Sequence, residues 1–166
     1  MAWYLNDFLA RLRETSAFGG GESSDLEMLR NAFPRLRFIQ ITRREKLRQA
    51  ISKARAVQTG LWKVQEGKTE IAEPRFDRPL IARCLSEAEV QENTWNAFFA
   101  RVGLQPFHVE YERLCQDYEA TIRAVLDFLE IVLPRRIKIN RPVTIRQSDA
   151  LSAQWEQRYR ASDVLH

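Results

Sequence analysis

Arg43, Arg44 and Ser52 are the side chains of this sequence best placed to bind an anion. The two arginines follow a short apolar segment that predicts a strand, and they precede a segment that predicts a helix. A bare cation is disfavoured at a helix N-terminus, but an anion bound there reverses that effect. Backbone N–H groups of the first turn, two guanidinium groups and the Ser52 hydroxyl can converge on one phosphate. The alternative is a solvated basic helix end with an ordinary mid-helix serine.

The predicted helix has an apolar side and a polar side. Its apolar stripe recurs with helical spacing and consists of Leu47, Ala50, Ile51, Ala54 and Val57. Arg48, Ser52 and Arg55 lie together on the opposite side. The strand before the arginine pair is formed by residues 38–41. The sequence therefore predicts a strand, a turn that carries the arginines, and a helix with one face in a core.

Three stretches within residues 42–62 resemble a known cofactor-binding segment. They are Thr42-Arg43-Arg44-Glu45-Lys46, Gln49-Ala50-Ile51-Ser52 and Ala56-Val57-Gln58-Thr59-Gly60-Leu61-Trp62. They are similar to the 3′-phosphate-binding segment of sulfotransferases that use 3′-phosphoadenosine 5′-phosphosulfate (PAPS), and more narrowly to the bacterial trehalose 2-sulfotransferase family. The resemblance implies that Arg43 and Ser52, nine residues apart, clamp the 3′-phosphate. Arg44 has the spacing of more distant sulfotransferases, so the choice between the two arginines stays open.

A basic segment at residues 131–149 carries five cations and no acid before Asp149. The cations are Arg135, Arg136, Lys138, Arg141 and Arg146. Pro134 and Pro142 disfavour regular structure, so the segment is predicted to be a loop that is solvated or folds over an anion. The tail of this loop resembles the C-terminal part of the same family. The resemblance implies that Arg146 and Gln147 contact the cofactor.

Helical and strand patterns alternate along the chain and predict an α/β fold with parallel strand pairing. Helices are predicted for residues 1–12, for a short segment after the capping box Ser24–Glu27, for a segment capped by Ser86 and ended by Gly103, and for residues 117–129 and 150–160. Residues 107–112 alternate as in a strand, which makes His108 a structural residue rather than a catalytic one. Residues 19–23 are predicted to be a flexible break and residues 63–71 a small hairpin.

The family resemblance extends from about residue 3 to about residue 160, in three blocks. It implies a single, partial sulfotransferase domain over residues 1–166, with a P-loop-like three-layer fold around a parallel sheet. We expect the fold to be incomplete, because the family's N-terminal part has no counterpart here. That part holds the first strand, the phosphosulfate loop, the general base and most sugar contacts, so no catalytic residue is assigned. An unpaired sheet edge would then favour a homodimer.

Composition limits the class of protein and the kinds of site that this chain can form. The chain has 166 residues, a net charge of +4 and 45% hydrophobic residues, which are values typical of a soluble globular protein with anionic partners. Two scattered cysteines and two histidines predict neither a disulfide framework nor a metal site, and they favour the cytoplasm. The sequence shows no apolar run long enough to span a membrane.

The function implied by the resemblance is transfer of a sulfuryl group from PAPS to a hydroxyl of trehalose or of a related glycan or glycolipid. That reaction leaves adenosine 3′,5′-bisphosphate. This chain would carry the 3′-phosphate-binding half of the site, and its activity alone is in question. Two other hypotheses stay open: an inactive remnant that binds nucleotide or a partner, and a basic nucleic-acid-binding module. The second requires cations along a groove with interleaved aromatic residues, whereas the sequence gathers them at one helix entry and one loop, so nucleic acid is not the expected partner.

Overall fold

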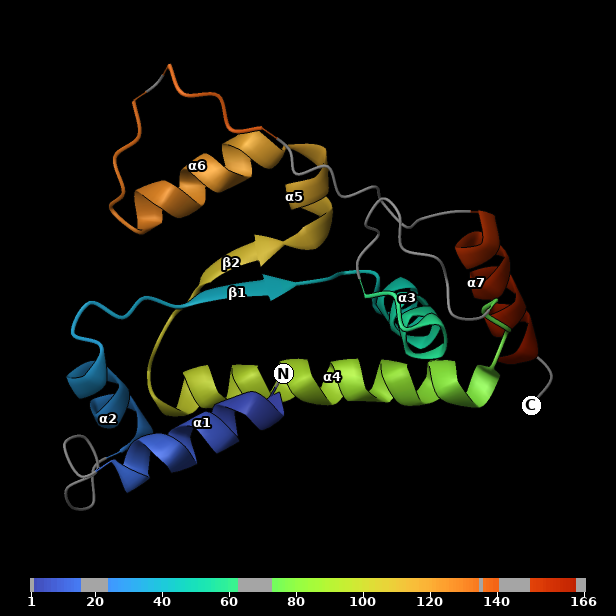
Figure 1. Ribbon diagram of the computed structural model, residues 1–166, viewed down its shortest axis with the longest axis horizontal. Helices are drawn as coiled ribbons and strands as arrows, with labels where there is room; N and C mark the ends of the chain where they lie inside the picture. The colour runs from blue at the N-terminus through green and yellow to red at the C-terminus, as the bar shows by residue number, and fades with distance from the viewer. Residues whose placement is uncertain (1, 16–23, 63–72, 135, 141–149, 164–166) are drawn as a thin grey trace.

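Two short parallel strands lie at the centre of the molecule, and both arrowheads in Figure 1 point the same way. Strand β1 (Ile39–Thr42) pairs with β2 (Phe107–Glu110), with Ile39 opposite Phe107 and Thr42 opposite Glu110. The carboxyl ends of the two strands therefore share one edge of the sheet. This pairing confirms the prediction of a mixed helix and strand fold with parallel strands.

The computed structural model describes residues 2–15, 24–62, 73–134, 136–140 and 150–163. Its helices are, in chain order, α1 (Ala2–Glu14), α2 (Asp25–Ala32), α3 (Lys46–Thr59), α4 (Arg78–Arg101), α5 (Tyr111–Gln116), α6 (Tyr118–Phe128) and α7 (Ala150–Asp163). Figure 1 shows α5 and α6 on one side of the strand pair and the long helix α4 on the other. Within the described ranges, no helix has both the length and the apolar character needed to cross a membrane.

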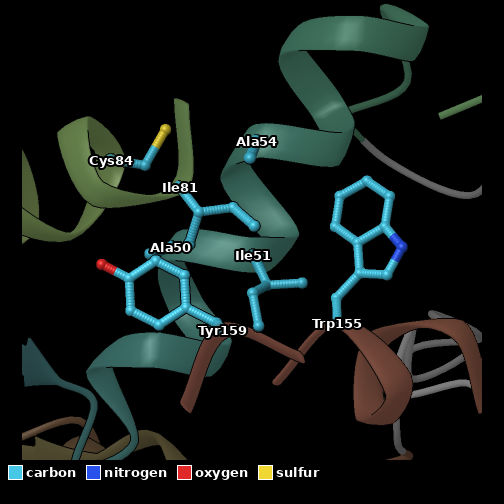
Figure 2. Close-up of a cluster of buried hydrophobic side chains, with 7 residues drawn as sticks. All are labelled: Ala50, Ile51, Ala54, Ile81, Cys84, Trp155 and Tyr159. Atoms are coloured by element: carbon cyan, nitrogen blue, oxygen red, sulfur yellow. The ribbon is translucent and has the colours of Figure 1, made fainter. Parts of the chain in front are cut away.

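One hydrophobic core joins α3, α4 and α7. Ala50, Ile51 and Ala54 of α3 are fully buried and meet Ile81 and Cys84 of α4. Helix α7 closes the cluster with two aromatic rings, those of Trp155 and Tyr159 (Figure 2). The small alanines let the neighbouring helices approach α3 closely, so α3 is held on two sides.

A second core lies under the beginning of β1. Leu9, Met28 and Leu29 from α1 and α2 pack with Phe98 and Phe99 near the end of α4. The ring of Phe38, just before β1, lies 5.5 Å from that of Phe99, centroid to centroid. Aromatic pairs in this geometry add roughly 0.5–1.5 kcal/mol beyond burial of their area. This core fixes where β1 starts, while the first core fixes the helix that follows β1.

The capping box at Ser24 is confirmed, since the Ser24 Oγ accepts the Glu27 N–H and the Glu27 carboxylate accepts the Ser24 N–H. The prediction that a helix begins at Ser86 is wrong. Helix α4 begins at Arg78, because the Asp77 carboxylate accepts the Leu80 N–H and a proline is tolerated in the first turn.

One residue predicted to be in the core is exposed. Val57 of α3 faces solvent, although it fits the helical spacing of the apolar stripe. Ala56 and Thr59 of α3 are buried, although they lie outside the predicted stripe. The predicted break at residues 19–23 and the predicted hairpin at residues 63–71 lie outside the described residues.

Candidate functional site

A pocket of about 240 Å³ opens at the carboxyl edge of the strand pair. It lies where the chain leaves β1 for α3 and leaves β2 for α5, which is where parallel sheets commonly bind ligands. Its lining comes from both exits and consists of Arg43, Arg44, Glu45, Arg48, Tyr111, Glu112, Cys115 and Gln116. The two arginines predicted from the sequence are therefore in the lining together, with Arg48 as a third guanidinium group.

Arg43 is the most enclosed of the three arginines. Its side chain is 24% exposed, and its guanidinium carbon lies 4.6 Å from the centroid of the Tyr111 ring. A cation over an aromatic face in this way is stabilised by about 0.5–2 kcal/mol. Its Nε is buried and has no hydrogen-bond partner among the described residues, since Glu112 Oε1 lies 3.8 Å away. Arg43 is thus held in place with an unused donor, which suits an oxygen of a bound anion.

Glu112 supplies a carboxylate at the β1–α3 turn. Its Oε2 accepts the backbone N–H of Arg44 at 3.1 Å, and its Oε1 accepts that of Glu45 at 3.3 Å. Burial of the carboxyl group opposes ionisation, but these two N–H groups, its own N–H and the Arg43 cation outweigh burial and lower the pKa of Glu112. An anion does sit at this turn, as the electrostatics of the helix start require, and it belongs to the protein itself.

Arg44 and Arg48 are held differently from Arg43. The Arg44 side chain is 66% exposed, and its Nη1 lies 3.8 Å from Oε1 of Glu110. The Arg48 Nε lies 2.8 Å from Glu156 of α7 and 2.9 Å from Glu45. The hydrogen bond to Glu156, followed by the charges of Glu156 and Glu45, raises the pKa of Arg48. Arg44 is free to move toward a ligand, whereas Arg48 ties the pocket wall to α7.

Ser52 is half-buried one turn beyond Arg48 on α3 and does not line the pocket. It lies on the helix face between Arg48 and Arg55, and both of these side chains contact α7, through Glu156 and Ser152 respectively. The polar side of the helix predicted from the sequence is therefore the side that meets α7. Arg146 and Gln147 lie outside the described residues.

Tyr111 and Glu112 are site residues that sequence reasoning missed, because the alternating pattern assigned both to the predicted strand. The signal was present: with parallel pairing, residues just after β1 and just after β2 must meet at one edge. His108 is exposed on β2 and is not part of the pocket lining. Cys115 does contribute to the lining.

The chemistry available at this site is recognition of an anion. Three guanidinium groups against two carboxylates, Glu45 and Glu112, leave the lining net positive. Guanidinium forks match phosphate and sulfate oxygens in geometry as well as in charge. Within the described part of the chain, no group of three or more histidine, cysteine, aspartate and glutamate side chains is arranged to hold a metal ion.

Comparison with known proteins shows what the chain is similar to. The chain is 30% identical over 125 residues to the trehalose 2-sulfotransferase of Mycobacterium tuberculosis (strain ATCC 35801 / TMC 107 / Erdman), which covers 75% of this chain and 45% of the relative. It is 32% identical over 122 residues to the trehalose 2-sulfotransferase of Mycolicibacterium smegmatis, covering 74% of this chain and 45% of that relative. The chain thus matches less than half the length of each relative.

A family model extends this similarity to nearly the whole chain. The match to the family described as Stf0 sulphotransferase covers residues 3–162. That range contains both strands, the residues that line the pocket and all of helix α7 except its last residue. The chain therefore belongs to the Stf0 sulphotransferase family.

Proposed function

We propose that this chain contributes the 3′-phosphate-binding half of a sulfotransferase that transfers a sulfuryl group from PAPS to a carbohydrate hydroxyl. Trehalose, or a related glycan or glycolipid, is the proposed acceptor, because both relatives are named for trehalose. The observation that carries the proposal is the pocket at the β1–α3 turn, where Arg43, Arg44 and Arg48 meet. Adenosine 3′,5′-bisphosphate, the product, would bind there through the same phosphate.

The residues present fit such a phosphate. The unpartnered Nε of Arg43 offers a buried donor, and the exposed Arg44 offers a second fork that can close on a ligand. We propose Arg43 as the main ligand and Arg44 as the supporting one. Ser52, Arg146 and Gln147 are proposed as further contacts, by resemblance to the family segment.

In sulfuryl transfer the cofactor supplies the reactive sulfate, and the protein positions it and stabilises charge on the leaving phosphate. This chain's share in that work is to bind and orient the nucleotide. We propose no general base among its residues.

The proposal includes the architecture around the site. A P-loop-like three-layer fold with one domain over residues 1–166 would place the basic segment 131–149 beside the nucleotide, and the cytoplasm is the proposed compartment. Self-association is also proposed. Ile41 of β1 is 63% exposed, and among the described residues β1 pairs only with β2. An apolar strand with an open edge favours pairing with a second copy.

Calorimetric titration with adenosine 3′,5′-bisphosphate tests the proposed function, with adenosine 5′-monophosphate as the ligand that lacks the 3′-phosphate. We expect saturable one-to-one binding of the bisphosphate and at least roughly tenfold weaker binding of the monophosphate. Arg43→Ala and Ser52→Ala should weaken the bisphosphate selectively. Arg83→Ala, which removes an arginine of α4 that does not line the pocket, is the control.

Two other outcomes would replace this proposal. Binding only to oligonucleotides, with a steep loss of affinity as salt rises, would indicate a nucleic-acid-binding module. Binding to neither ligand would indicate a remnant that interacts with other partners. Equal affinity for the bisphosphate and the monophosphate would show that the 3′-phosphate is not what the arginines bind.

A further inference from the structure

Glu112 connects the exit of one strand to the exit of the other. It lies in the first turn after β2, yet its carboxylate reaches the backbone of the turn that follows β1. The two N–H groups it accepts, those of Arg44 and Glu45, lie directly between the main candidate ligand Arg43 and the start of α3. The Glu45 side chain gives α3 no N-terminal capping hydrogen bond, so Glu112 provides the carboxylate that this turn lacks locally.

The Glu112 carboxylate accepts no hydrogen bond from the Nε of the neighbouring Arg43. Glu112 Oε1 lies 3.8 Å from the Arg43 Nε, which is too far for a hydrogen bond, and that Nε has no other partner among the described residues. The guanidinium group of Arg43 is held instead by the face of the neighbouring Tyr111 ring. The carboxylate therefore occupies the backbone donors of the turn and not the side-chain donors.

We propose that Glu112 is a positioning residue for the nucleotide, one that fixes the β1–α3 turn so that the guanidinium groups of Arg43 and Arg44 face the pocket. This inference rests on the proposed function, because it assigns a support to the same phosphate site. With the amides of Arg44 and Glu45 already engaged, a phosphate is bound through arginine side chains rather than through this part of the backbone.

A competing role for Glu112 is that of an internal anion that blocks the site until phosphate displaces it. The two roles predict opposite effects of Glu112→Gln. Loss of a blocking charge would tighten nucleotide binding, whereas loss of a support would weaken it. The geometry favours the support, because a blocking carboxylate would pair closely with the guanidinium donors, and this one does not.

The test compares Glu112→Gln with the wild-type chain in two measurements. Calorimetry gives the affinity for adenosine 3′,5′-bisphosphate, and nuclear magnetic resonance gives the exchange protection of the Arg44 and Glu45 amides. Glutamine keeps the size of the side chain but loses its charge and one acceptor. We expect binding to weaken roughly tenfold, as loss of charged hydrogen bonds implies, and the two amides to lose protection. Glu110→Gln is the control, because it removes a nearby charge that accepts neither amide; its binding should be unchanged or tighter.

Each of the following results would overturn the positioning role of Glu112. Unchanged or tighter binding by Glu112→Gln, or equal protection of the two amides in both proteins, overturns the positioning role while leaving the proposed function intact. Failure of Glu112→Gln to fold, judged by circular dichroism, makes Glu112 a structural residue and also overturns the inference. If the wild-type chain does not bind the bisphosphate, the proposed function fails and this inference fails with it.

Discussion

Three arginines line one pocket but differ in what already holds them. Arg43 is stacked on Tyr111, Arg44 is mostly in solvent, and Arg48 bridges Glu45 and Glu156. Binding an anion with a side chain that is already ordered costs less conformational entropy than ordering a mobile one. The same residue type should therefore contribute unequally at these three positions.

Arginine-to-lysine substitutions test that order. Arg43→Lys keeps the charge but loses the flat fork and its stacking on Tyr111, so we expect affinity for adenosine 3′,5′-bisphosphate to fall roughly tenfold or more. Arg44→Lys is expected to cost only about two- to threefold, because its exposed side chain is not pre-ordered. Calorimetry at one salt concentration measures both. A larger loss for Arg44→Lys would make Arg44 the main ligand.

Two substitutions distinguish the contribution of the Tyr111 ring from that of its hydroxyl. Tyr111→Leu removes the face on which Arg43 stacks, and we expect nucleotide affinity to fall about three- to tenfold, in line with a cation–π contribution of about 0.5–2 kcal/mol. Tyr111→Phe keeps that face and should bind within about twofold of wild type. Titration calorimetry of both variants provides the comparison. Equal losses in the two would assign the effect to the hydroxyl instead of the ring.

At the residue scale, sequence reasoning found the arginine pair of the site but not the residues that meet it from α5. Arg43 and Arg44 were identifiable because a strand exit followed by a helix start is a local pattern. Tyr111 and Glu112 contact that turn from 67 or more positions further along the chain, as the Glu112 bonds to Arg44 and Glu45 show. Such contacts depend on the pairing of β1 with β2, and no local pattern encodes them.

At the element scale, α3 is held between α4 and α7, and this double contact explains what the sequence pattern could not predict. A single apolar stripe was visible, but the polar side of α3 also packs, through Arg48 to Glu156 and Arg55 to Ser152. The error at α4 has a different cause. Ser86 and Glu89 have capping-box spacing, but both are exposed side chains within a helix that Asp77 starts.

Removal of the Trp155 ring tests how strongly α7 holds α3. Trp155 is 3% exposed, and its ring meets that of Phe76 edge to face at 5.8 Å. We expect Trp155→Ala to lower the free energy of unfolding by about 3–5 kcal/mol, as for other buried aromatic residues. Urea denaturation followed by circular dichroism measures the change. Gln157→Ala, at an exposed position of the same helix, is the control, and a loss below about 1 kcal/mol for Trp155→Ala would mean that α7 is only loosely docked.

At the scale of the whole molecule, carboxylates join elements that are far apart in the sequence. Glu87 of α4 accepts a hydrogen bond from Lys53 of α3 at 2.6 Å, and Glu156 of α7 accepts one from Arg48 of α3 at 2.8 Å. Glu112 ties the end of β2 to the turn after β1. Three separate parts of the chain are therefore attached to the β1–α3 unit by ionised glutamates.

The pKa of each of these glutamates is lowered in the folded protein. The hydrogen bond from Lys53 is the main cause for Glu87. Burial acts in the opposite direction on Glu112 and Glu156, but the hydrogen bonds from backbone N–H groups and from Arg160 and Arg48 outweigh it. A carboxylate whose pKa is lower in the folded than in the unfolded chain stabilises the fold while it is ionised.

Acid should therefore loosen the molecule around the β1–α3 unit. The unfolded chain takes up protons first as pH falls through about 4.3, so the free energy of unfolding should be nearly constant from pH 7 to about pH 5 and fall below that as the three glutamates become protonated. Urea denaturation at a series of pH values measures this dependence. Glu156→Gln should lower stability at pH 7 by about 1 kcal/mol, since its arginine partners are partly exposed, and should flatten the acid limb. Glu119→Gln, which removes an ion pair made within α6, is the control. Stability that rises as the pH drops below 5 would contradict this account, because it would mean that the ionised glutamates oppose folding.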